Sequence, residues 1–139
     1  MLAAFAFKEG LVKYKGSCHC QAVTFEIEAP DVIEAEHCNC SICSKSGFLY
    51  LILPLNNFKL LSGENFLSTY TFNTSVAKHT FCKVCGIKAF YTPRSNPDGI
   101  DINVQCLDVE AEKVKITEFD GINWEENAHK VAHKSKRAI

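Results

Sequence analysis

The chain lacks any apolar run that approaches the ~20 residues needed to span a bilayer. Its longest run, Phe48 to Pro54, stops at a proline and is typical of a buried strand. It also lacks a charge excess, since 15 basic and 16 acidic residues give a net charge of −1. A short basic group near the C-terminus, which we expect to be solvated, comprises Lys130, Lys134, Lys136 and Arg137. These absences predict neither a membrane nor a nucleic-acid partner.

The start of the chain lacks the pattern of a secretion signal. No basic residue leads it, and Lys8 and Glu9 interrupt the apolar stretch too early. A disulfide framework, which eight cysteines would otherwise allow, is therefore the weaker interpretation. We expect an intracellular protein, cytoplasmic or nuclear, whose thiols are reduced and available to metals. The oligomeric state stays open.

Cysteine, by contrast, is abundant, and seven of the eight cysteines fall in three clusters: Cys18-x-Cys20, Cys38-x-Cys40-x-x-Cys43 and Cys82-x-x-Cys85. Zinc takes four thiolates in a tetrahedron at about 2.3 Å. If the two pairs close one four-sulfur site, the triplet can hold a second zinc with one position open. Iron-sulfur binding is an alternative. A redox role for the last pair is weakened by the lack of a βαβ pattern around it.

The triplet predicts a particular chemistry. Three thiolates on a zinc dication leave a net charge near −1, which makes a poorer Lewis acid than three neutral imidazoles would. An incoming thiol suits such a site, where it would lose its proton and become a nucleophile. The hypothesis is addition of a thiol to a small electrophile such as an aldehyde. No general acid or base can be assigned from the sequence.

Three histidines and one further cysteine lie near these clusters. His37 precedes Cys38 and could fill the fourth position of the triplet, which would close that site. His19 should point away from the first cluster, and His79 is interpreted as an ordinary strand residue. Cys106, the odd thiol, is interpreted as a small core residue.

Hydrophobic patterning predicts one compact, mainly β domain with many short strands. We expect strands near 23–27, 33–37, 48–53, 58–61, 66–72, 87–91, 100–104 and 114–119. Only 123–134 has helical spacing, with Asn123 as an N-cap and Trp124, Ala128 and Val131 on one face. The expected division is an N-terminal extension over 1–14, a zinc-binding domain over 15–126, and a helix end and basic tail over 127–139.

Three segments extend the cysteine clusters: Gly16-Ser-Cys-His-Cys20 with Val23-x-Phe25-Glu26, then His37-Cys-Asn-Cys-Ser-Ile-Cys43 with Lys45-Ser-Gly47, and Thr80-Phe-Cys-Lys-Val-Cys-Gly86. Together they resemble the glutathione-dependent formaldehyde-activating enzyme family. Two further stretches, Tyr91 to Pro97 and Cys106 to Asp108, are similar to the animal branch that includes centromere protein V. One departure is Gln21, which stands where the family usually has glycine.

The resemblance implies the family's β-rich, tent-like zinc-binding fold with a short C-terminal helix, and two zinc ions per chain. A structural zinc would be held by Cys18, Cys20, Cys82 and Cys85, and an open, catalytic one by Cys38, Cys40 and Cys43. It also implies carbon-sulfur lyase activity, which forms or cleaves S-(hydroxymethyl)glutathione from formaldehyde and glutathione as the small thiol substrate. The alternative is a non-catalytic zinc module that binds a protein partner, as a relative of centromere protein V.

Overall fold

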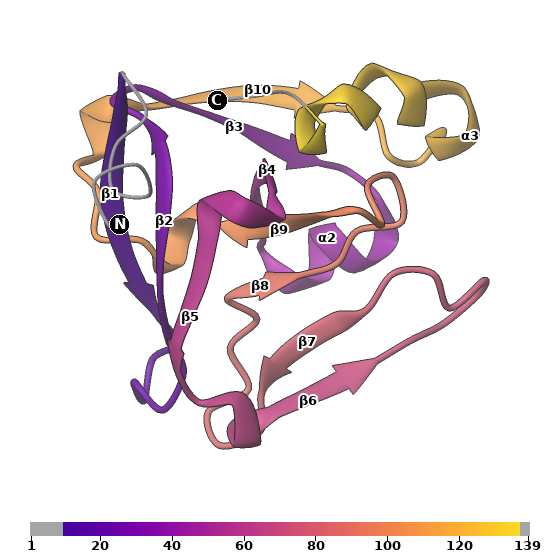
Figure 1. Cartoon of the computed structure of the whole chain (residues 1–139). Helices are drawn as coiled ribbons and strands as arrows, with labels where there is room; N and C mark the ends of the chain where they lie inside the picture. Colours follow the sequence, from indigo (N-terminus) through magenta and orange to yellow (C-terminus); the bar gives the residue numbers. More distant parts are fainter. Residues whose placement is uncertain (1–9, 137–139) are drawn as a thin grey trace.

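The computed structural model describes residues 10–136, which form three antiparallel or mixed β-sheets and a few short helices (Figure 1). The strands are β1 (Leu11–Ser17), β2 (Thr24–Pro30), β3 (Ile33–Cys38), β4 (Leu49–Pro54), β5 (Phe58–Ser62), β6 (Leu67–Tyr70), β7 (His79–Cys82), β8 (Phe90–Tyr91), β9 (Gly99–Asn103) and β10 (Val114–Phe119). The predicted mainly β fold class is therefore confirmed.

The sheets have the orders β1-β2-β5, β10-β3-β4-β9-β8 and β6-β7. All strand pairs are antiparallel except β10 with β3. In that parallel pair Phe119 lies opposite Cys38, so the segment after β10 leaves the sheet beside Cys38, Cys40 and Cys43. These three residues are called the second cysteine cluster below, and the other two cysteine pairs together form the first. In Figure 1 the β6-β7 hairpin extends to one side of the two larger sheets, below β8.

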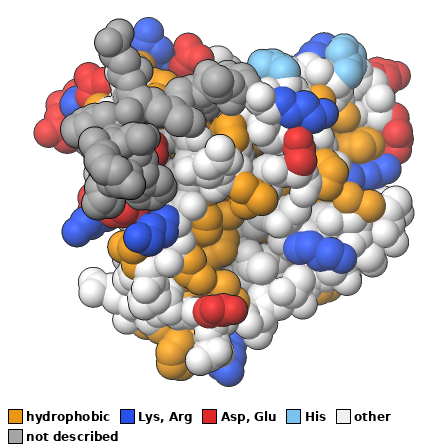
Figure 2. All heavy atoms as spheres, viewed as in Figure 1, with side chains coloured by type: hydrophobic (Ala, Val, Ile, Leu, Met, Phe, Trp, Pro, Cys, Tyr) orange, Lys and Arg blue, Asp and Glu red, His pale blue; other side chains and the backbone are white. Residues whose placement is uncertain are grey.

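The main core contains the inward-facing side chains of these two larger sheets. On β2 the alternating residues Phe25, Ile27 and Ala29 are buried, as expected for a half-buried strand. β9 is buried along its whole length because β4 and β8 pair with it on both sides. Hydrophobic side chains also run across the middle of one face, with charged ones mostly toward its margin (Figure 2). No helix among residues 10–136 is long and apolar enough to cross a bilayer.

A smaller apolar cluster is separate from the main core. Its buried members are Cys38, Cys43, Phe48, Tyr50 and Tyr91, with Cys40, Ile42 and Phe119 packed against them. The rings of Phe48 and Tyr91 meet edge to face, with centroids 5.2 Å apart. The second cysteine cluster therefore lies in an aromatic environment of its own.

The structure contains helix in more places than the sequence predicts. The expectation of helix only over 123–134 is wrong, because α2 (Ser41–Ser46) carries Cys43 and ends at Gly47, whose φ of 66° is left-handed. Six residues are too few to show helical periodicity in a sequence. The remaining short helical turns are η1 (Leu55–Asn57), η2 (Glu64–Phe66), η3 (Val104–Cys106) and η4 (Ala111–Lys113).

The expected C-terminal helix forms in broken pieces: α3 (Trp124–Asn127), then the 3₁₀ turns η5 (Ala128–Lys130) and η6 (Ala132–Ser135). Asn123 occupies the N-cap position but makes no capping bond with its side chain. Its amide instead donates to Asp120 at 2.7 Å. Of the basic tail, Lys130, Lys134 and Lys136 are described, and Arg137 lies outside the described residues.

The strand predictions differ from the structure in three places. β1 and β7 are not predicted, since β1 buries its residues irregularly and β7 has only four residues. The strand expected over 87–91 is reduced to β8, because Ile87 instead accepts a hydrogen bond from the backbone of Cys82 at 3.0 Å. The turn around Cys82 therefore competes with the start of that strand.

Candidate metal centres and cavity

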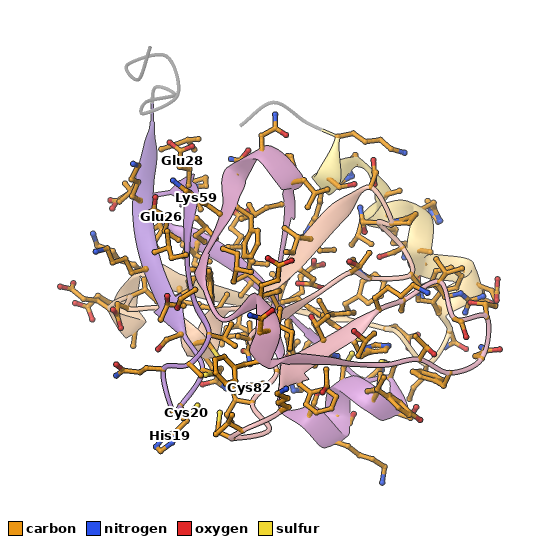
Figure 3. All side chains as sticks on the ribbon, turned by 60° about the horizontal axis from the view of Figure 1, so that its bottom comes forward. His19, Cys20, Glu26, Glu28, Lys59 and Cys82 are labelled. Atoms are coloured by element: carbon orange, nitrogen blue, oxygen red, sulfur yellow. The ribbon has the colours of Figure 1, made fainter. Side chains whose placement is uncertain are left out.

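The first cysteine cluster joins two distant segments of the chain. Cys18 and Cys20 follow β1, while Cys82 ends β7 and Cys85 lies in the turn after it. The four sulfur atoms all lie within 4.8 Å of one another. Cys20 Sγ is 3.7 Å from the sulfurs of both Cys18 and Cys82. In Figure 3 His19 points outward while Cys20 turns toward Cys82, as the sequence predicts for His19.

The second cluster is built around the junction of β3 and α2. Cys38 ends β3, Cys40 occupies the N-cap position of α2, and Cys43 lies within that helix. Their three sulfurs also lie within 4.8 Å of one another. Gly121 passes directly over them, since a Cβ added there would lie only 2.3 Å from Cys38 Sγ. A side chain at this position would therefore occupy the space beside the sulfurs.

Both donor sets fit a soft metal ion such as zinc. All seven groups are thiols, and their mutual distances allow each set to approach one cation. Among residues 10–136 no histidine, carboxylate or further cysteine joins the three sulfurs of the second cluster. His37 in particular turns away, because its Nδ1 lies 3.0 Å from Glu118 Oε1 on the exposed side of the sheet.

The thiols of each cluster affect one another's protonation. The neighbouring Cys38 thiol lowers the pKa of Cys40 to about 7, with help from the backbone N–H of Ile42 and the charge of Lys88. Burial opposes ionisation of Cys85, but the backbone N–H groups of Cys20 and Ile87 bring its pKa down to about 6. Each cluster thus contains a thiol that ionises near neutral pH, and a thiolate is the form that binds metal.

A chain of buried polar groups reaches the second cluster from the interior. The Tyr50 hydroxyl contacts Cys43 Sγ and accepts a hydrogen bond of 3.1 Å from the Tyr91 hydroxyl. Asp101 lies behind them, 1% exposed, and its Oδ1 accepts from the backbone N–H of Leu51 at 3.1 Å. Burial raises the pKa of Asp101 well above its usual range, which favours the protonated form of this carboxyl.

His79 proves to be more than an ordinary strand histidine. Its ring stacks between Tyr91 and Phe72, with centroids 4.9 and 5.4 Å away. Lys88 Nζ lies 2.7 Å from its Nδ1 and 3.8 Å from the centroid of the Tyr91 ring. Burial, followed by the charge of Lys88, lowers the pKa of His79 to about 4. The imidazole is therefore neutral at pH 7, and its buried Nε2 has no partner among residues 10–136.

One cavity of about 330 Å³ connects these groups. Its wall includes the three cysteines of the second cluster, Tyr50, Tyr91 and His79. The same wall includes Arg94, Trp124 and Glu125, together with Phe72 and Ile122. Most of the wall is apolar or aromatic, with a few convergent polar groups, as is usual in sites for small molecules.

The sequence predicts the cysteine groups but not the rest of the wall. Tyr50, Tyr91 and Asp101 lie on strands, where their positions resemble those of ordinary core residues. Arg94 lies in the loop after β8, and Glu125 lies in α3, 31 positions further along the chain. Cys106 lies in η3 and packs against the main core, in line with its interpretation as a small core residue.

The fold and these clusters define a small, mainly β, cysteine-rich protein with two candidate metal centres. The family model described as glutathione-dependent formaldehyde-activating enzyme matches residues 13–119. The chain therefore belongs to this family. A crystal structure of a Rhodobacter sphaeroides protein is also similar, with a TM-score of 0.66 and 36% sequence identity. The match covers 74% of this chain and 99% of that protein.

Proposed function

We propose that the protein is a zinc-dependent carbon-sulfur lyase that forms or cleaves the adduct of a small thiol, of the glutathione type, with formaldehyde or a related aldehyde. The observation that carries this proposal is the opening of the three-sulfur cluster into a cavity of about 330 Å³. This volume suits a small molecule and not a folded partner. Family membership supports the same class of reaction.

Cys38, Cys40 and Cys43 would hold the zinc of this site, and the four sulfurs of the first cluster would hold a structural one. When bound, the ion supplies Lewis-acid stabilisation of thiolate sulfur at neutral pH. In the forward reaction the substrate sulfur attacks the carbonyl carbon and a C–S bond forms. The carbonyl π electrons move to oxygen, which takes up a proton equivalent to the one lost by the thiol. The reverse reaction breaks that bond and releases both reactants.

His79 is the residue we propose to face the reacting oxygen. Lys88 is protonated at pH 7, since burial lowers the pKa of its amine only to about 8. An ammonium at Nδ1 makes that nitrogen the acceptor, which leaves the imidazole proton on Nε2. A neutral Nε2–H donor in the cavity wall can stabilise negative charge that develops on an aldehyde oxygen.

The alternative, a non-catalytic interaction module, requires that the fourth position of the second site be filled by the protein. His37 is the residue that the sequence offers for this purpose, and its hydrogen bond to Glu118 favours the open arrangement. The described wall also presents a hollow and not a flat apolar surface. Both observations favour the enzyme.

The proposal is tested with zinc-loaded protein, glutathione and formaldehyde, by following exchange between free and adduct formaldehyde carbon by NMR. We expect faster exchange than in buffer. His79→Gln should reduce the rate about tenfold or more while two zinc ions per chain remain bound. Exchange at the uncatalysed rate, in a protein that carries both ions, would refute the proposed activity.

A further inference from the structure

The cavity wall has an uneven distribution of charge. Among the described residues that line it, Arg94 is the one permanently cationic side chain. The carboxylate of Glu36 is already paired with Lys134 at 2.8 Å, and burial raises the pKa of Asp101, which favours its uncharged form. The three thiols of the second cluster line the same cavity. An anionic group on a ligand would therefore be attracted to Arg94 and repelled by thiolate sulfur.

The guanidinium of Arg94 is held in place but has hydrogen-bond donors to spare. Its Cζ lies 3.7 Å from the centroid of the Trp124 ring, a stacked arrangement that fixes its plane. Within residues 10–136 its side chain makes a single hydrogen bond, from Nη2 to Glu125 Oε1 at 3.0 Å. A guanidinium has five N–H donors, so most of its donors remain available to a carboxylate.

Glu125 supplies the opposite charge next to Arg94. Its side chain is 80% exposed, and that of Arg94 is 30% exposed. An ion pair this exposed contributes little stability, so exchanging it for contacts with a ligand costs little. The two residues thus present a cation and an anion side by side in the wall of the cavity that the three cysteines also line.

We propose that Arg94 and Glu125 are specificity-determining residues that recognise the zwitterionic amino-acid end of the thiol substrate. Arg94 would bind the α-carboxylate and Glu125 the α-ammonium, as found together at the γ-glutamyl end of glutathione. The thiol of the same molecule would then point to the cluster of Cys38, Cys40 and Cys43. This inference rests on the proposed function for the identity of the cavity's occupant.

The test measures binding and not turnover. S-methylglutathione keeps the zwitterion but has no thiol to react, and its monoethyl ester at the γ-glutamyl α-carboxylate lacks only the carboxylate assigned to Arg94. Calorimetry with zinc-loaded protein should show that wild type binds the acid at least tenfold more tightly than the ester, as expected for one charge-assisted contact. Arg94→Gln should abolish this preference, and Arg94→Lys should restore part of it. Glu125→Gln should weaken the binding of the acid and of the ester to the same degree, because both ligands keep the α-ammonium.

A matched control is Lys113→Gln, which removes an exposed ion pair with Asp31 outside the cavity and should leave the preference unchanged. The proposal is overturned if wild type does not bind S-methylglutathione or binds the acid and the ester with equal affinity. It is also overturned if Arg94→Gln weakens the binding of both ligands equally. The last result would mean that Arg94 only anchors Trp124. Because no ligand here can react, a wild-type protein that catalyses adduct exchange but binds acid and ester equally would refute this inference and leave the proposed function standing.

Discussion

The hydroxyl of Tyr50 contacts the sulfur of Cys43 and accepts a hydrogen bond from Tyr91. Tyr50 is 8% exposed and Tyr91 5% exposed, so water cannot readily replace either hydroxyl. A hydrogen bond to a thiolate ligand spreads its charge and orients its sulfur. The aromatic cluster around the three cysteines therefore has an electrostatic role as well as a packing one.

We expect Tyr50→Phe to lower the zinc affinity of the second site by about tenfold to a hundredfold, since loss of an outer hydrogen bond has effects of this size. Competition with a chromophoric chelator measures this affinity. Tyr14→Phe is the control, because Tyr14 is also buried but its hydroxyl bonds to the backbone of Pro30 and Asp31. Equal zinc affinity in the two variants would contradict a role for Tyr50 at the site.

Gly121→Ala should block the second site without unfolding the protein. The new Cβ would lie 2.3 Å from Cys38 Sγ and 3.0 Å from Cys40 Cβ, so the sulfurs must shift. We expect one zinc ion per chain in place of two, with a stability loss of about 1–3 kcal/mol from overpacking. Native mass spectrometry counts the ions. Gly10→Ala meets no atom within 4 Å and should retain both ions.

The two clusters should differ in their effect on stability. Cys18→Ser removes a buried thiol of the cluster that brings the turn after β1 next to the turn after β7, and that we propose as a zinc ligand, so we expect a loss of at least about 4 kcal/mol. Cys40→Ser changes a cluster whose members lie close in sequence, and should cost less while abolishing activity. Urea unfolding of both zinc-loaded variants gives the comparison. A larger destabilisation by Cys40→Ser would reverse the proposed structural and catalytic assignment.

Gln21→Gly should stabilise the protein. Gln21 has φ of 65°, a left-handed conformation that costs a residue with a Cβ about 1–2 kcal/mol and costs glycine almost nothing. The greater freedom of glycine in the unfolded chain offsets part of this gain, so we expect a net increase of a few tenths to about 1 kcal/mol. Thermal unfolding measures it, and Gln21→Ala, which keeps the Cβ, should show no gain.

The stability of the protein should rise with pH between about 4 and 6.5 through His79. The folded-state pKa of about 4 lies below the ordinary value of 6.5, so in this range the unfolded chain binds the extra proton. This contribution is complete above pH 6.5 and is lost as pH falls toward 4. The slope of the unfolding free energy against pH can approach about 1.4 kcal/mol per pH unit from this residue. His79→Asn should remove it relative to wild type in urea titrations, whereas a change at exposed His19 should not.

How far the sequence predicts the site depends on how local each signal is. Thiols one or two residues apart must point to nearly the same place whatever the fold, so Cys38, Cys40 and Cys43 are recognisable as a group. Tyr50 and Arg94 give no such signal, because one resembles a core residue and the other a loop residue. Their roles arise only when β4 and the segment after β8 meet at the cavity.

The sequence by itself determined the mainly β class, the family and the grouping of seven cysteines, because strand alternation and ligand spacing are short-range properties of the chain. Only the tertiary structure decided that His37 turns to Glu118, that His79 faces Lys88, and that Arg94 and Glu125 share a wall with the sulfurs. These relationships join residues far apart in the chain. They depend on strand register and packing direction, which no local pattern encodes.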